Sequence, residues 1–85
     1  MSETVETRLA VIAIVVEQSE SVAALNALLH EYGALIIGRM GVPYPSKGIS
    51  LISVAIDGPN DAISALTGKL GRLPGVSVKT AYSKL

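Results

Sequence analysis

Residues Leu9–Val16, with the sequence LAVIAIVV, are eight consecutive apolar residues rich in β-branched types. β-branched side chains favour extended backbone, and a strand that is apolar on both faces is typical of the middle of a sheet. The polar triplet Glu17-Gln18-Ser19 ends the run. The run is far shorter than the roughly 20 residues that cross a bilayer, so it is not a membrane span. Its two apolar faces predict a central strand of a sheet.

Two helices of matching pattern follow this strand. Their apolar positions recur at i, i+3, i+7 and i+10, which is the spacing of a helix that buries one face. The second set lies 41 positions after the first, and the pairs are Val22 and Ile63, Leu25 and Leu66, Leu29 and Leu70, and Tyr32 and Leu73. The repeat predicts two helices that pack in equivalent ways.

Residues suited to helix ends flank both apolar patterns. Ser19 or Ser21 can cap the first helix, and Gly33 is suited to the position that follows its last turn. Asn60 can cap the second helix, and Pro74-Gly75 is expected to stop it.

Three further strands are predicted. Ala34–Met40 follows the first helix, and Gly41–Gly48 is expected to be a loop because its two prolines cannot donate hydrogen bonds inside a sheet. Ile49–Ile56 places larger apolar residues on one face and mostly small residues on the other. Val76–Ser83 alternates in polarity, which suits an edge strand.

The resulting order is strand–helix–strand twice. Two such units in one sheet give an α+β, ferredoxin-like βαββαβ sandwich, with an antiparallel sheet and two helices on one face. Residues 1–7 are expected to be a flexible tail and residues 8–85 a single domain. The sheet face without helices would expose a large apolar patch, so we expect a second copy to cover it in a homodimer or homotetramer. The residues concerned are Leu9, Val11, Ala13 or their alternates, Leu51 and Ala55.

The composition excludes several kinds of protein. The chain has 85 residues, formal net charge zero and no cysteine. Disulfides, thiolate catalysis and zinc–thiolate sites are therefore excluded, and the positive charge that non-specific nucleic-acid binding needs is missing. We expect a cytoplasmic protein that does not contact membranes. Five of the seven acidic residues precede Tyr32 and six of the seven basic ones follow it, either as solvated surface or as complementary edges of neighbouring subunits.

Small residues form a flank on both predicted helices. In the second helix they include Gly68 and Gly71, although glycine inside a helix costs about 1 kcal/mol relative to alanine. Close packing between the two helices of one chain is the favoured explanation. Close approach of a partner chain or a ligand is the alternative.

Candidate ligand-binding residues surround Gly38-Arg39-Met40-Gly41. Arg39 can supply charge and Tyr44 a stacking surface, Gly38 and Gly41 can give access to the backbone, and His30 is a further candidate. The same glycines can instead mark a bulge or a strand end. We assign no catalytic residue, metal ligand or cofactor, since no nucleophile–base pattern or ligand cluster is present.

The phrases HEYG, GRMG-PY, ISALTGKLG and GV-VKTAYSK, which lie in this order between Arg8 and Leu85, resemble the iron-only hydrogenase system regulators. These are small proteins with an ACT-like fold, similar to the C-terminal domain of the nickel-responsive repressor. The resemblance implies a ferredoxin-like fold, assembly into oligomers and a transcriptional regulatory role. The sequence departs from the repressor in lacking its His and Cys nickel ligands and a ribbon-helix-helix segment before the first strand, so we expect neither nickel sensing nor direct nucleic-acid binding.

The sequence therefore predicts a non-catalytic, ACT-like homo-oligomer of the hydrogenase system that senses a small ligand or a separate regulatory protein. A ligand-free interaction or scaffold protein, which acts only through its oligomer surfaces, is the alternative. An enzyme that turns over acyl phosphates ranks third.

Overall fold

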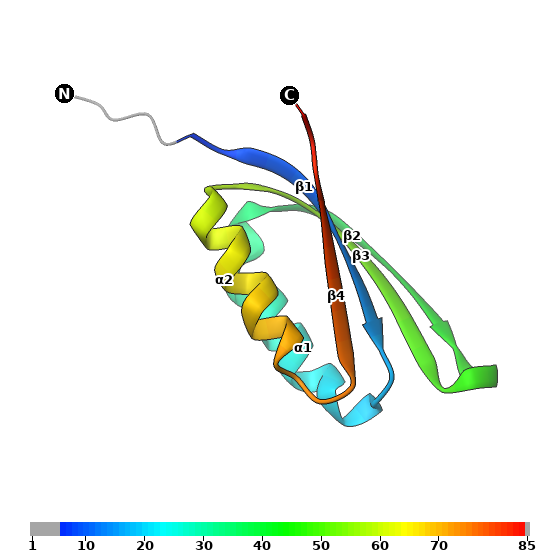
Figure 1. Ribbon diagram of the computed structural model, residues 1–85. Coiled ribbons are helices and arrows are strands. Elements are labelled where there is room, and N and C mark those ends of the chain that lie inside the picture. The colour runs from blue at the N-terminus through cyan, green and yellow to red at the C-terminus, as the bar shows by residue number, and fades with distance from the viewer. Residues whose placement is uncertain (1–5, 85) are drawn as a thin grey trace.

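Residues 6–84 are described by the structure, a computed structural model, and within them four strands and two helices form two layers (Figure 1). Residues 1–5 of the predicted tail lie outside the described residues. The elements are β1 (Arg8–Val16), α1 (Val22–Glu31), β2 (Ile36–Tyr44), β3 (Ile49–Gly58), α2 (Asn60–Gly71) and β4 (Val76–Tyr82). Short 3-10 turns at Ser19–Ser21, Gly33–Leu35 and Pro45–Lys47 lie between them.

The sheet has the strand order β2-β3-β1-β4, and every pair of neighbours is antiparallel. Both helices cover the same face of this sheet (Figure 1). The predicted α+β, ferredoxin-like βαββαβ fold is therefore confirmed. Leu9–Val16 is central, as predicted, because β1 has β3 on one side and β4 on the other.

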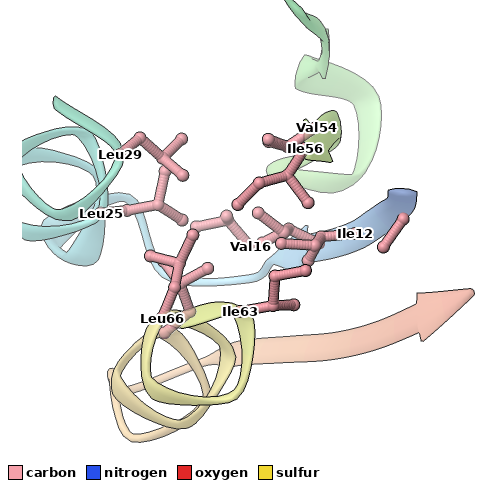
Figure 2. Close-up of a cluster of buried hydrophobic side chains, with 11 residues drawn as sticks. Ile12, Val16, Leu25, Leu29, Val54, Ile56, Ile63 and Leu66 are labelled. Carbon is pink, nitrogen blue, oxygen red and sulfur yellow. The ribbon is translucent and has the colours of Figure 1, made fainter. Parts of the chain in front are cut away.

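The core lies between the sheet and the helices. Every second residue of β1 points into it, namely Ala10, Ile12, Ile14 and Val16, and all four are buried. Val54 and Ile56 of β3 meet them from the next strand, and the helices contribute Leu25, Leu29, Ile63, Leu66 and Leu70 (Figure 2). The matched helical pattern thus buries Leu25 with Leu66 and Leu29 with Leu70, whereas Val22, Tyr32 and Leu73 are only partly buried.

The other face of the sheet is open and apolar in the single chain. Leu9, Val11, Ala13 and Leu51 are exposed on it, as predicted, whereas Ala55 is only partly exposed. We call this side of the sheet, which faces away from both helices, the open face. The two apolar sides of β1 therefore have different surroundings, because only one of them is covered by the helices.

The predicted loop Gly41–Gly48 is wrong in its first half. Strand β2 runs from Ile36 to Tyr44, and Pro43 lies within it opposite Ser50. β2 is an edge strand, so it has one neighbour only and the missing N–H of a proline need not break the ladder. A bulge between Ile36 and Gly38 shifts the register near the start of the strand.

Three predicted helix ends also differ. Gly33 begins a 3-10 turn without a positive φ, so it is not a left-handed cap of α1. Asn60 is the first residue of α2 and Pro59 holds the cap position. Ser21 holds the predicted cap position of α1, but its oxygen accepts no cap bond, and its hydroxyl donates to the carbonyl oxygen of Pro74 at 2.6 Å.

That hydroxyl belongs to a junction between the turns that precede α1 and β4. The Glu17 amide donates to the carbonyl oxygen of Gly75 at 2.7 Å. Gly75 has φ +70°, and a Cβ there would lie 2.6 Å from Cγ of Gln18. Only glycine therefore fits this crossing of the two turns.

The small-residue flank of α2 does not pack within the chain. A Cβ added to Gly68 or Gly71 would meet no atom within 4 Å. The favoured explanation, close packing between the two helices of one chain, is therefore wrong for these two glycines.

We predict opposite effects for two glycine-to-alanine substitutions. Gly68→Ala should raise the free energy of unfolding by about 0.5–1 kcal/mol, because the methyl group enters open space and alanine favours the helix. Gly75→Ala should lower it by more than about 1 kcal/mol, because the left-handed backbone and Gln18 both oppose a side chain. Urea titration of both variants checks this, and equal shifts in the two would contradict it.

Candidate functional site

Strand β2 divides the predicted site residues between the two faces of the sheet. Arg39 lies opposite Val54, whose side chain is in the core, so Arg39 faces the helix side. Gly41 lies opposite Ile52 on that same side. Gly38 and Tyr44 alternate with them and fall on the open face. The five candidates therefore do not form a single cluster.

Arg39 reaches from the edge strand to the first helix. Its Nη2 donates a hydrogen bond to Oδ1 of Asn26 on α1 at 3.1 Å. An open hollow of about 340 Å³ lies here between α1 and β2. Its lining residues are Asn26, Leu29, His30, Gly33, Ile36 and Arg39.

His30 and Arg39 thus share one hollow, whereas the remaining candidates lie elsewhere. Gly41 lines a neighbouring hollow with Arg39 and Asn26. Gly38 borders a depression that extends onto the open face, and Tyr44 is half exposed near the far end of β2. Stacking by Tyr44 on a ligand held by Arg39 would therefore have to cross the sheet edge.

Asn26 is a site residue that was not predicted from the sequence. Asn26 precedes His30 by four positions, so both side chains lie on one face of α1. Its carboxamide orients the guanidinium of Arg39, and nothing in the spacing of β2 shows which helix that arginine reaches. The i, i+4 relation to His30 was the available signal.

The charge of Arg39 is not neutralised by any other residue that the structure describes. No carboxylate lies within ion-pair distance of it among residues 6–84. A guanidinium has five N–H donors in a planar fork, so donors remain after the bond to Asn26. The arrangement can bind an anion such as a carboxylate or a phosphate group. Residues 6–84 contain no group of three His, Cys, Asp or Glu side chains that could hold a metal ion.

A second polar cluster ties the end of α1 to α2. Lys69 donates to the hydroxyl oxygen of Tyr32 at 3.0 Å and lies 3.5 Å from the carboxylate of Glu31. The hydrogen bond to Tyr32 and then the charge of Glu31 raise the pKa of Lys69 above its ordinary value of 10.5. Since the cluster is on the surface, its contribution to stability is small.

The sign of the pH effect follows from the raised pKa. The charged form of Lys69 is favoured in the folded state, so its contribution is complete below pH 10.5 and is lost as the pH rises through the raised value. Lys69→Met should therefore lower the melting temperature slightly between pH 7 and pH 10, and the difference should shrink above that range. Thermal melts across the pH series test this, with the exposed Lys47→Met as the control. A deficit that stays constant to the highest pH would contradict it.

The fold and the family can now be compared with known proteins. A βαββαβ domain of this size, with both helices on one face of the sheet, defines an ACT-like α+β protein. A family model described as "TM1266-like: Iron-only hydrogenase system regulator, putative" matches residues 8–80. The chain belongs to this family of iron-only hydrogenase system regulators, as the sequence motifs indicated.

One solved structure supports this family assignment, and a second shares the fold. The uncharacterized protein TM1266 from Thermotoga maritima is 36% identical, with a TM-score of 0.89 over 93% of this chain and 100% of that one. The C-terminal domain of the MgtC protein from Mycobacterium tuberculosis is 11% identical, with a TM-score of 0.71 over 98% of this chain and 95% of its own. The latter likeness shows the fold alone.

A formyltetrahydrofolate deformylase from Pseudomonas putida KT2440 shares the fold at 11% identity and a TM-score of 0.62. That match covers 86% of this chain but 28% of the deformylase chain. No curated protein matches the chain. Neither helix within residues 6–84 is long and apolar enough to cross a membrane.

Proposed function

We propose that this chain is a non-catalytic regulator of the iron-only hydrogenase system that works as a homo-oligomer and senses a small anionic ligand. The ligand would bind in the hollow between α1 and β2. Its anionic group would accept hydrogen bonds from Arg39, with Asn26 and His30 beside it. The family supports the regulatory role, and the hollow supports the sensing.

The proposal rests on the hydrogen-bond partners of the Arg39 guanidinium. It is held by a neutral amide, 3.1 Å away, and by no carboxylate among the described residues. A guanidinium fixed in this way is already oriented, so an arriving anion gains charge-assisted hydrogen bonds with little loss of side-chain freedom. The nearby imidazole of His30 can donate a further hydrogen bond.

A regulatory rather than a catalytic role fits the same hollow. The groups that line it with Arg39 include no carboxylate, hydroxyl or thiol that could act as a nucleophile. We propose that the protein acts in the cytoplasm and affects transcription through a separate regulatory protein. A ligand-free scaffold is the second candidate, and the apolar open face favours it because that surface can act without any ligand.

Arg39→Ala separates the two candidates. Three probes cover the anion chemistry: inorganic phosphate, citrate and AMP. For a sensor, at least one probe should raise the melting temperature, since a ligand at 100 times its Kd adds about 2.7 kcal/mol to stability. Arg39→Ala should weaken that binding about 10- to 100-fold, as the loss of a charged hydrogen bond of about 1.5–3 kcal/mol requires.

Arg72→Ala is the matched control. Arg72 is an exposed arginine just past the end of α2, and it does not line the hollow. Its removal should leave probe binding unchanged in calorimetric titrations. Equal losses of probe affinity in the two variants would mean that overall charge, and not the Arg39 site, determines binding. If no probe stabilises the wild type, the scaffold function is favoured.

A further inference from the structure

The open face gathers all of the large exposed apolar side chains of the described chain. β1 contributes Leu9 and Val11, β3 contributes Leu51, and the remaining four come from β2 and its bulge: Ile37, Met40, Val42 and Tyr44. Val11 is 47% exposed at the middle of this face and Met40 is 66% exposed toward its edge. The helical side of residues 6–84 has no exposed side chain of this kind.

The open face is large enough for a weak, reversible contact between two copies. Four strands spaced about 4.8 Å apart and about nine residues long, at about 3.3 Å each, span roughly 19 by 30 Å. Full overlap of two such faces would bury about 1,100 Å², and overlap of two faces whose strands cross would bury about 700 Å². Areas below about 1,200 Å² are typical of weak or transient interfaces.

Two charged residues lie on the open face within the strands, and they carry opposite signs. Asp57 of β3 lies opposite Leu9 of β1, and Lys79 of β4 lies opposite Ala13 of β1. Both side chains are exposed, and neither forms an ion pair within residues 6–84. The open face therefore presents one unpaired carboxylate and one unpaired ammonium group.

Val11 lies midway between these charges. It is two residues from Leu9 and two from Ala13 along β1, and Asp57 and Lys79 are each one strand away on opposite sides. We consider a two-fold axis that lies above Val11, parallel to the sheet and perpendicular to the line joining the two charges. Rotation about this axis exchanges the positions of the two charges. When a second copy is applied by that axis, Asp57 of each copy meets Lys79 of the other.

We infer that a second copy of this chain covers the open face in a symmetric, face-to-face dimer, with Val11 at the axis and two reciprocal Asp57–Lys79 pairs at its sides. A two-fold interface must be complementary to itself, and this placement of one acid and one base meets that requirement. This inference rests on the oligomeric part of the proposed function and does not involve Arg39.

The centre of the open face suits close contact between two sheets. The neighbours of Val11 on this face are small, with Ala55 opposite it on β3 and Ala81 opposite it on β4. Shallow hollows flank this centre, one beside Leu9 and Ile37 and the other beside Met40 and Leu51. Protruding side chains of one copy can therefore fill depressions of the other.

Charge reversal tests the inference. Asp57→Lys places two lysines against each other at each pair, and Lys79→Asp places two aspartates together. Each single variant should dimerise at least tenfold more weakly than the wild type in sedimentation equilibrium. An equimolar mixture of the two variants should form a heterodimer of wild-type strength, because every pair in it has opposite charges again. The double variant should likewise recover.

The control is Asp61→Lys, which makes the same charge change in the first turn of α2, away from the open face. It should keep the wild-type mass. The inference is overturned if the wild type is a monomer at high concentration. That result would indicate that the open face binds a different protein. It is also overturned if the mixed single variants stay as weak as each alone. Neither of these results would change probe binding at Arg39. Failure of the dimer can therefore be distinguished from failure of the sensor proposal.

A cross-link tests the position of the axis. The chain has no cysteine, so Val11→Cys introduces its only thiol, and a residue on a two-fold axis faces its own copy. Facing sheets lie about 10 Å apart, which a short bis-maleimide can bridge. Rapid formation of a covalent dimer is expected, with Asp61→Cys on the helix layer as the slow control. Equal rates for the two variants would place the axis elsewhere.

Discussion

The structure depends on the two-sided apolar character of β1. The strand places Ile12 and Ile14 against the helices and Val11 and Ala13 on the opposite side, and side chains along a strand alternate strictly. Two helices can cover one face of a four-stranded sheet, and in this topology both lie on the same face (Figure 1). Burial of one side therefore leaves the other side as the main apolar surface of the molecule.

That constraint separates two kinds of surface. Arg39 lies on the helix side at the edge of the sheet, where Asn26 orients its guanidinium. Met40, the next residue, lies on the open face among apolar side chains. A polar binding hollow and an apolar contact surface thus share one edge strand, and the period of two residues keeps them apart.

The sequence was sufficient to predict the fold because its strongest patterns, the helical periodicity and the β-branched run, consist of the residues that form the core. The matched helical pattern predicted the burial of Leu25 and Leu66, and the β-branched run predicted the central strand. Local signals were less reliable. Pro43 indicated a loop, but an edge strand has no second neighbour to require its N–H group. Ser21 holds the predicted cap position, but its side chain makes no cap bond and donates to the carbonyl oxygen of Pro74, 53 residues away in the sequence. The partner of Arg39 could not be predicted, because it depends on how an edge strand and a helix meet in space.

The pairing of β1 has a consequence for synthesis of the chain. Its neighbours are β3 and β4, which end at Gly58 and Tyr82 and are both made after the first helix and β2. The ribosome therefore makes the most apolar segment of the protein before either of the strands that pair with it. Unpaired apolar strands are prone to aggregate. LAVIAIVV has no strand partner until β3 has been made, and its second partner is the last strand of the chain.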